Sequence, residues 1–345
     1  MKKAWICVKR RYRRKRKLVT PPWLKTLAVC GGLLWVVLLI GLLVSPQPQE
    51  RHAPQNTAGP LIDIKKAAGA QTIRFYGTEL NEVVQMDLEE YVCNVVAAEM
   101  PAYYEPEALK AQAVAARTLA VYKRAHGGCN KAKNADICGD FAHCQAYSSA
   151  LQQREDFGDS YDTLKEKLQS AVDATKGEVI TYDGEVIQVF YHAMSGGITE
   201  DVQNVFAASL PYLRSVESKE ELSYEDRVSV ERMSRTQMAQ RIAHAYPNAS
   251  EALGVDILSR YASGRVDEVR VCGIVMKGTQ LRTLLALPST DFTVKEEGED
   301  IVFTCTGYGH GVGMSQVGAN LMAQKGKSYR EILSRYYLDT RIENH

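Results

Sequence analysis

The chain has 345 residues, of which 45% are hydrophobic, so it can bury a full core in one large domain or in two lobes. The formal net charge of +1 hides an asymmetry, because residues 1–25 hold 11 of the 42 lysines and arginines and no acid. The remainder carries 31 basic and 41 acidic side chains. Nucleic-acid binding usually needs a basic face, so we expect no nucleic-acid partner.

The first 60 residues predict a membrane anchor and a tether. Residues 27–44 carry no charge and, with the residues just ahead, are long enough to span a bilayer, so we predict a transmembrane anchor over 24–44. The basic stretch 1–23 precedes it, which places that tail in the cytoplasm and the domain 61–345 outside. Residues 45–60 form a Pro-rich linker. A cleaved signal peptide is the alternative, but no convincing small-x-small site follows the apolar run.

The body of the chain predicts an α+β fold of mixed helices and antiparallel strands. The stretch 71–88 alternates as a hairpin does, and Asp183-Gly184 lies between two β-rich runs, which is typical of a hairpin turn. Residues 210–267 are charged and irregular, so we interpret them as an inserted lobe of a two-lobed fold that forms a cleft. Helical patterns cover 87–100, 106–125, 161–175, 235–246, 278–287, 315–325 and 328–338.

The helix predicted over 87–100 directs a carboxylate along an apolar face. Its apolar stripe comprises Leu88, Val92, Val95 and Val96. Glu99 lies on the same stripe, just before Pro101 ends the helix. Burial and the negative end of the helix dipole both raise a carboxyl pKa, which suits a proton donor near neutral pH. A solvent-facing glutamate paired with Arg117 or a lysine is the structural alternative.

The next predicted helix, 106–125, carries Arg117 among small and apolar neighbours. Its many alanines let another backbone approach closely, so Arg117 is a candidate for the lining of a cleft. A surface arginine with a buried stem explains the pattern equally well.

Three cysteines and a histidine lie within sixteen residues of one another. Cys129, Cys138, His143 and Cys144 make a ligand set that tetrahedral zinc accepts. Outside the membrane, a disulfide between Cys129 and Cys138 or between Cys138 and Cys144 is the alternative. We favour the metal because His143 directly precedes Cys144, which a disulfide does not require. A four-ligand site is closed, hence structural.

Two glycine-bearing loops carry the remaining candidate residues. The first follows a predicted strand and contains Tyr191, Ser195, Gly196, Gly197 and Thr199. It has no G-x-S-x-G elbow, so a serine hydrolase has little support. The second, "GYGHGVGMSQVGAN" over 307–320, matches neither the dinucleotide fingerprint nor the Walker loop. It predicts a loop that presents His310 ahead of a helix with Gln316 at its start.

Five motifs appear in the order seen in one family, between about residue 61 and the C-terminus. They are "VVAAEMP", "EALKAQAVAARTLA", "HCQAY", "SGGITED" and "GYGHGVGMSQVGANLMAQKG". The chain thereby resembles the stage II sporulation protein D family, membrane-anchored lytic transglycosylases that act on peptidoglycan in spore-forming bacteria.

This resemblance implies that Glu99 is the catalytic acid and that other residues wall a glycan cleft around it. The implied substrate-binding residues are Arg117, Tyr191, Ser195, Gly196, Gly197, Thr199, Gly309, His310, Gly311 and Gln316. We hypothesise that the backbone amides of 309–313 contact a sugar, with His310 and Gln316 as hydrogen-bonding side chains. Relatives commonly have a histidine where this chain has Ala132, so Cys129 or, as a weaker alternative, His126 would replace it as a zinc ligand, or the metal would be lost.

The resemblance also implies glycan strands stripped of their stem peptides as substrate, at the engulfing septal membrane. The implied partners are a sporulation amidase or endopeptidase and a membrane scaffold protein, and catalysis would need no cofactor. Two other functions remain open: a non-catalytic wall-binding scaffold and a zinc-dependent wall amidase.

Overall fold

The structure is a computed structural model that describes residues 71–79, 81–206, 208–250 and 254–345. These residues belong to one compact unit. None of the helices in this described part combines the length and apolar character that a bilayer crossing needs. The predicted tail, anchor and linker (1–23, 24–44 and 45–60) lie outside the described residues.

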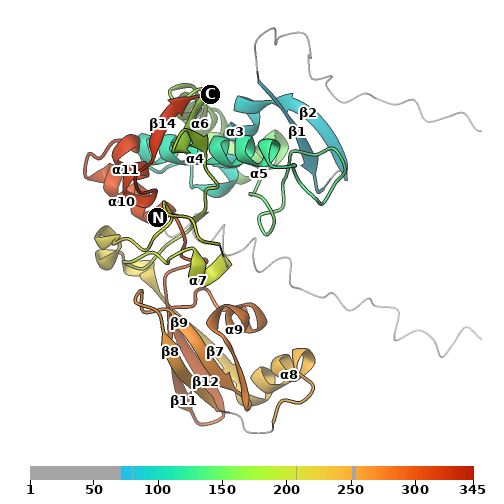
Figure 1. Ribbon diagram of the computed structural model, residues 1–345, viewed down its shortest axis with the longest axis vertical. Helices are drawn as coiled ribbons and strands as arrows, with labels where there is room; N and C mark the ends of the chain where they lie inside the picture. Colours follow the sequence, from blue (N-terminus) through green and yellow to red (C-terminus); the bar gives the residue numbers. More distant parts are fainter. Residues whose placement is uncertain (1–70, 80, 207, 251–253) are drawn as a thin grey trace, which may run out of the picture. The chain divides into compact units, whose positions relative to one another are not determined.

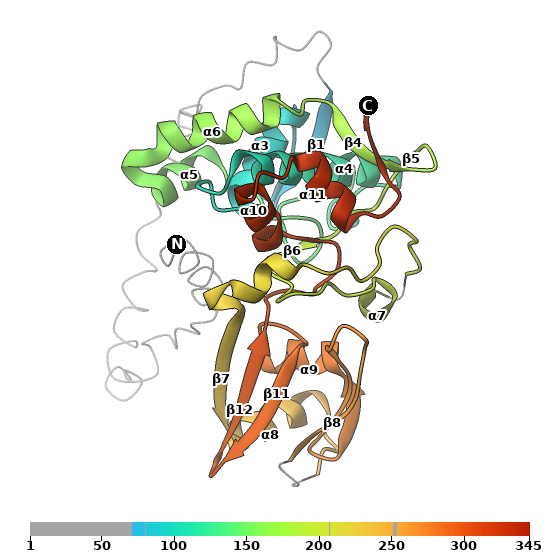
Figure 2. The same cartoon turned by 90° about the vertical axis from the view of Figure 1, so that its left-hand side faces the viewer.

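The larger of two hydrophobic cores is mainly helical, and we call the part built around it the helical lobe. Figure 1 shows its helices gathered around α4, and Figure 2 shows α6, α10 and α11 packed near it. The helices are α3 (Leu88–Glu99), α4 (Pro106–Ala125), α5 (Ala150–Phe157), α6 (Tyr161–Asp173), α10 (Gln316–Gln324) and α11 (Tyr329–Tyr336). Two small sheets complete it, ordered β2-β1-β3 and β14-β4-β5. Their strands are β1 (Thr72–Gly77), β2 (Glu82–Asp87), β3 (Ile137–Cys138), β4 (Glu178–Tyr182), β5 (Glu185–Val186) and β14 (Arg341–Asn344).

Local signals explain why α3 and α4 begin and end where they do. The Asp87 side chain accepts hydrogen bonds from two first-turn amides of α3 and so caps it. Two residues beyond the end of α3, Pro101 prevents its continuation. Pro106 occupies the first position of α4, where a missing N–H costs nothing. Consequently, the turn 100–105 is short and holds the end of α3 close to the start of α4.

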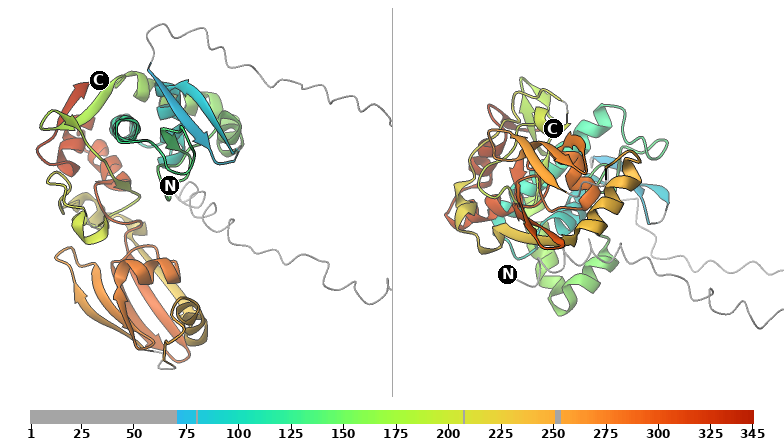
Figure 3. Two further views of the ribbon diagram at one scale, coloured as in Figure 1. Left: turned by 45° about the vertical axis from the view of Figure 1, so that its right-hand side comes forward. Right: turned by 90° about the horizontal axis from the view of Figure 1, so that it is seen from below.

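A second core lies within residues 233–305, and we call the part formed by residues 228–306 the β lobe. It contains two antiparallel sheets, ordered β11-β12-β7 and β10-β9-β8, and the helices α8 and α9. Figures 1 and 3 show these elements grouped apart from the helical lobe. Their bounds are β7 (Val228–Ser234), α8 (Arg235–Ala245), β8 (Val255–Arg260), β9 (Val266–Val271), β10 (Ile274–Lys277), α9 (Gly278–Leu285), β11 (Phe292–Glu297) and β12 (Asp300–Thr306).

The second core and the insert predicted over 210–267 differ in extent. The second core extends to Cys305, because β11 and β12 pair with β7 in one sheet. Residues 195–227 instead cross between the two cores as loops and short turns. These turns are α7 (Gln203–Phe206), η4 (Lys219–Ser223) and η5 (Glu225–Arg227).

The predicted secondary structure is largely confirmed. All seven predicted helices occur with ends shifted by two residues at most, and both predicted hairpins form. Two short parallel pairs were not predicted: β1 with β3, and β6 (Tyr191–His192) with β13 (Met314–Ser315). The second pair matters most for the site, because it brings two loops more than 100 residues apart in sequence side by side.

Candidate active site

Glu99 is the last residue of α3 and is half-buried where the helix ends. Its Oε1 accepts a hydrogen bond of 2.6 Å from the backbone N–H of Ala146, and its Oε2 accepts one of 3.4 Å from Nε2 of Gln316. Burial raises the pKa of Glu99 to about 7, although both hydrogen bonds act to lower it. Such a carboxyl group can both donate and accept a proton near neutral pH.

Uncharged polar side chains surround this carboxyl group. Gln316 begins α10 and is buried, and its Nε2 also lies 3.4 Å from Oε1 of Gln112 on α4. Tyr191 donates a 2.6 Å hydrogen bond to Oε1 of Gln145, the neighbour of Ala146. Burial, and then the negative charge of Glu99, raise the pKa of Tyr191 well above its usual value, so its phenol stays protonated beside the acid.

The pairing of β6 with β13 places Tyr191 and Gln316 at this position. Tyr191 is in register with Met314, and His192 with Ser315, so Gln316 follows directly on the strand beside Tyr191. Ser315 caps α10 by accepting a hydrogen bond from the backbone of Gly318, which fixes the first turn of the helix. The predicted association of Glu99, Tyr191 and Gln316 therefore has a structural basis.

Arg117 does not lie with these residues. Its guanidinium donates to both carboxylate oxygens of Glu89, at 2.9 and 2.5 Å, and to the carbonyl of Glu178, and its side chain is 1% exposed. Glu89 is in the first turn of α3, whereas Glu99 is at the opposite end, about 15 Å away at 1.5 Å per residue. Arg117 therefore joins α3 to α4 and β4 at a distance from Glu99, and its predicted contact with substrate stays a prediction.

The loop after β6 is also held internally. Ser195 and the backbone N–H of Gly196 both donate to the buried carboxylate of Glu221, at 2.8 and 2.9 Å. Thr199 is fully buried and pairs with the backbone of Val216. Ser195 and Thr199 thus anchor the loop, and their predicted sugar contacts stay predictions.

Gly196 and Gly197 lie in this loop with positive φ values of 83° and 128°. The N–H of Gly196 is taken by Glu221, and a side chain at Gly197 would collide with Leu222, which lies 2.6 Å from the position of a Cβ. An internal contact therefore accounts for the N–H of Gly196, and the predicted approach of a sugar to these two glycines stays a prediction.

Glycines in the loop 307–313 are explained by internal packing as well. A Cβ at Gly311 would lie 2.6 Å from Nε of the buried Arg265, and one at Gly313 would lie 2.0 Å from the carbonyl oxygen of Phe190. The N–H of Gly309 donates to the carbonyl of Pro288. The hypothesis that the amides of 309–313 bind a sugar is not supported at Gly309, and the glycines let the loop lie directly against β6.

His310 is half-buried in an aromatic group with Phe190, Phe206 and His192. Its Nδ1 accepts a hydrogen bond from the N–H of Val312 at 3.1 Å. Burial lowers the pKa of His310 to about 3, so it is a neutral side chain at physiological pH. Within the described residues, no hydrogen bond links His310 to Glu99, and its predicted role at the sugar stays a prediction.

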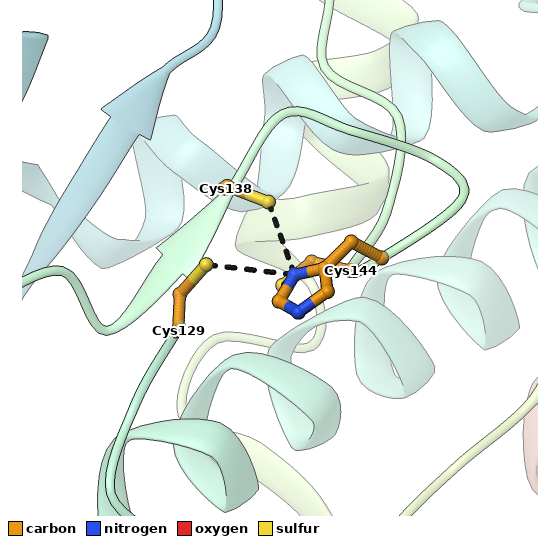
Figure 4. Close-up of side chains that lie close together, drawn as sticks. Cys129, Cys138 and Cys144 are labelled. Atoms are coloured by element: carbon orange, nitrogen blue, oxygen red, sulfur yellow. Dashed lines mark hydrogen bonds between the residues drawn. The ribbon is translucent and has the colours of Figure 1, made fainter. Parts of the chain in front are cut away.

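Cys129, Cys138, His143 and Cys144 form a separate cluster whose ligand atoms all lie within 4.8 Å of one another. Figure 4 shows the three cysteine side chains gathered beside β3. The sulfurs lie 3.5, 3.5 and 3.3 Å from Nδ1 of His143, and the cysteines are free thiols. Tetrahedral zinc, with bonds of about 2.0 Å to nitrogen and about 2.3 Å to sulfur, separates such ligands by about 3.5 Å. The donor set and its spacing therefore fit zinc.

Three residues of the site lacked a sequence signal. The N–H of Ala146 and the amides of Gln112 and Gln145 all lie in the immediate surroundings of Glu99 or Tyr191. Gln145 also donates a 2.8 Å hydrogen bond to the buried Tyr91 hydroxyl on α3, which fixes its amide group. Gln145 and Ala146 lie in the quoted motif "HCQAY", but nothing in that motif indicates that its backbone faces the acid.

Comparison with known proteins assigns the chain to a family. Residues 76–182 match the family model described as stage II sporulation protein. The chain is 33% identical over 325 residues to the stage II sporulation protein D of Bacillus subtilis (strain 168), covering 92% of this chain and 94% of that protein. The corresponding protein of Bacillus amyloliquefaciens is 33% identical over 89% of this chain and 92% of its own length.

A more distant similarity is to a Bacillus subtilis protein named amidase enhancer, which is 27% identical over 73% of this chain and 40% of its own length. The two sporulation proteins, by contrast, align over nearly the whole of both chains, so the match includes both lobes and the residues around Glu99. The chain therefore belongs to the stage II sporulation protein D family.

Proposed function

We propose that this protein is a peptidoglycan lytic transglycosylase that cleaves the bond between N-acetylmuramic acid and N-acetylglucosamine in denuded glycan strands. The observation that carries the proposal is the state of Glu99, a carboxyl group at a helix end with a pKa of about 7 among uncharged polar side chains. Family membership supports a role in wall remodelling and engulfment during sporulation.

The reaction needs one group that is first an acid and then a base. Protonated Glu99 donates its proton to the glycosidic oxygen, and the bond to the muramic C1 breaks. The 6-hydroxyl of the same sugar attacks the resulting oxocarbenium-like centre, and its proton passes to the Glu99 carboxylate. The product ends in 1,6-anhydro-N-acetylmuramic acid without consumption of water. A pKa near 7 suits both steps.

No acid of the described part of the chain is among the groups that shift the pKa of Glu99, which supports this mechanism over hydrolysis by a carboxylate pair. Burial raises this pKa, and the only described residues that lower it are Ala146 and Gln316, neither of which is acidic. Of the nearest acids in the following sequence, Glu107 has a structural role, because it pairs with Lys110 and accepts a hydrogen bond from the backbone of Tyr329. Glu105 directly precedes the first residue of α4.

Mass spectrometry of digested glycan tests the proposal. Denuded glycan incubated with the protein should yield anhydro-ended fragments, and Glu99→Gln should yield none while it still binds glycan. Gln keeps the size and hydrogen-bonding capacity of the side chain and removes only the transferable proton. Hydrated reducing ends would instead indicate a hydrolase, and unchanged activity in Glu99→Gln would remove Glu99 from the mechanism.

A structural zinc at Cys129, Cys138, His143 and Cys144 is a second part of the proposal, supported by the ligand spacing. Four protein ligands leave no open position, which disfavours a zinc amidase. Ala132 packs against the same cluster. Elemental analysis should therefore find one zinc per chain, none in Cys129→Ala, and restored zinc when Ala132→His is added to Cys129→Ala. Full zinc content in Cys129→Ala would exclude Cys129 as a ligand.

The proposed location is the cell membrane, with residues 1–23 in the cytoplasm and the domain 61–345 in the septal intermembrane space. The apolar run 27–44 and the basic residues before it support this orientation. Protease added outside intact protoplasts should degrade the domain and spare an epitope at residue 1. Protection of the domain would reverse the orientation. Proposed partners are a sporulation amidase or endopeptidase and a membrane scaffold protein.

The similarity to the protein named amidase enhancer favours a second candidate function, the stimulation of a wall amidase without cleavage of glycan. Glu99→Gln separates the two candidates. If amidase activity rises equally with the wild-type protein and with Glu99→Gln, stimulation does not need the proposed chemistry. If only the wild-type protein stimulates, the amidase responds to cleaved glycan ends.

A further inference from the structure

A large aromatic side chain is exposed on the short turn that follows Glu99. Tyr103 is 42% exposed, whereas Met100, Ala102 and Tyr104 around it are buried. Its ring meets the ring of Tyr104 edge-on, with 5.6 Å between the centroids. The buried neighbours fix the backbone of the turn, so the Tyr103 ring points outward from a rigid base.

Hydrogen bonds hold this turn in place relative to Glu99. The N–H of Glu105 donates to Oδ1 of Asn320 at 2.8 Å, and the Lys167 ammonium donates to the carbonyl of Tyr104 at 2.6 Å. Asn320 lies one turn after Gln316 on α10, so one face of α10 contacts both Glu99 and the turn. Tyr103 follows Glu99 by four positions in the sequence, which limits the distance between their Cα atoms to about 14 Å.

A second tyrosine lies on a segment that packs against the same helix as the turn of Tyr103. Tyr224 is half-buried between η4 and η5, and partial burial and then the nearby Tyr224 raise the pKa of Tyr103. η4 packs directly on α10, since a Cβ at Gly318 would lie 2.5 Å from Oγ of Ser218. Thus α10 contacts the elements that carry both tyrosines, and it also carries the Gln316 that touches Glu99.

The large apolar side chains that these two segments offer are few: Tyr103, Tyr224 and Leu222, of which Tyr103 and Leu222 are 42% and 55% exposed. Three such side chains are far fewer than the 20–30 residues per partner, or about 800 Å² each, of a stable protein interface. A sugar ring is a better match in size. Its C–H face is apolar and its rim carries hydroxyls, and tyrosine offers an apolar ring with a polar tip at little entropic cost.

We infer that Tyr103 and Tyr224 form an aromatic subsite that packs against a sugar ring of the glycan strand beyond the sugars held at Glu99. The inference rests on the proposed function and adds a determinant of chain length to it. A strand long enough to reach from Glu99 to Tyr103 gains this contact, whereas a shorter one does not. The subsite should therefore strengthen binding of long strands and leave short ones unaffected.

The test uses the full chain with Glu99→Gln, so that no probe is consumed, and measures binding of β-1,4-linked N-acetylglucosamine hexamer and trimer. Adding Tyr103→Ala or Tyr224→Ala should weaken hexamer binding by roughly three- to tenfold and leave trimer binding unchanged. Tyr103→Phe should keep most of the hexamer affinity because it keeps the ring. Val230→Ala, at an exposed valine of β7, is the matched control and should change neither affinity.

Hexamer affinity that is unchanged in both alanine variants overturns the subsite. So does a loss shared equally by hexamer and trimer, because it would place the tyrosines at the reacting sugars. If either variant instead loses binding to a purified amidase with glycan affinity intact, the pair of tyrosines is a protein-docking surface. Hexamer binding does not depend on turnover. The subsite can therefore be confirmed even if the wild-type protein yields no anhydro ends, so a failure of the proposed function and a failure of the subsite give different results.

Discussion

At the scale of the residue, the defining feature is the carboxyl group of Glu99, which stays protonated up to nearly neutral pH. Burial at the end of α3 raises the pKa of Glu99 to about 7, against the opposing hydrogen bonds from Ala146 and Gln316. The same arrangement costs stability, because the folded protein must accommodate a charge there at higher pH. Two predictions follow from this one group, one for activity and one for stability.

The pH dependence of cleavage should report the titration of Glu99. If Glu99 must be protonated to begin the reaction, kcat/KM falls as the pH rises through about 7. Gln316→Met removes a hydrogen bond that favours the carboxylate, so the falling limb should move to higher pH. Turnover assays between pH 5 and 9 check both, and a limb that Gln316→Met leaves in place would contradict the role of that hydrogen bond.

The stability of Glu99→Gln should differ from that of the wild type in a pH-dependent way. Folding raises the pKa of Glu99 from 4.5 to about 7, so between these values the folded state binds more protons and loses stability as the pH rises. Glutamine does not titrate. Urea unfolding should therefore show Glu99→Gln gaining about 1–3 kcal/mol on the wild type between pH 4.5 and 8. A constant difference across that range would mean that burial does not shift this pKa.

At the scale of the element, the glycine-rich loop 307–313 shows what sequence interpretation could not separate. Its glycines predict a close approach of the backbone, and the structure shows such approaches to Arg265 and to the segment at β6, while the contact with a sugar stays a prediction. A glycine that permits close approach gives the same sequence pattern whether the approaching group is a ligand or the protein's own backbone. By contrast, capping residues, prolines and the spacing of apolar residues act within a few positions of a helix end. The ends of α3 and α4 could therefore be predicted.

Gly313→Ala should be strongly destabilising, and Gly326→Ala is its matched control. Both glycines have positive φ, 71° and 80°, so both alanines carry left-handed backbone strain of about 1–2 kcal/mol. Only at Gly313 would the Cβ also meet a backbone atom, the Phe190 carbonyl oxygen at 2.0 Å. We expect Gly313→Ala to lose about 1–3 kcal/mol more than Gly326→Ala in denaturant unfolding. Equal losses would mean that the loop does not need its close contact with β6.

At the scale of the whole molecule, a buried arginine links the β lobe to the loops between the two cores. Arg265 is 2% exposed and donates to the carbonyls of Ile198 and Ser195 at 2.9 Å each, while its Nε faces Gly311. The loops around β6 and β13, which carry Tyr191 and Gln316, are therefore supported from the β lobe. We therefore expect a substitution of Arg265 in the β lobe to affect the loops that carry Tyr191 and Gln316.

Arg265→Leu should loosen those loops. The substitution leaves two buried carbonyl groups without donors, which costs about 2–5 kcal/mol. Amide hydrogen exchange should accelerate at Thr199, whose N–H bonds to Val216, and stay slow at Ile180 in β4. Arg270→Leu, on β9 with its side chain 50% exposed, is the control and should change stability by less than about 0.5 kcal/mol. Unchanged exchange at Thr199 would show that Arg265 does not support the loops.

The sequence by itself determined the helices, the hairpins, the family, the cluster of Cys129, Cys138, His143 and Cys144, and Glu99 as the candidate acid. Each of these depends on neighbours within a few residues, on short motifs or on residue types. Only the tertiary structure decided which polar groups surround that acid and which merely hold loops. Arg117, Ser195 and Thr199 are satisfied by partners 28, 26 and 17 residues away in the chain. Such pairings arise when β6 meets β13 and α4 packs on α3, and no local pattern encodes them.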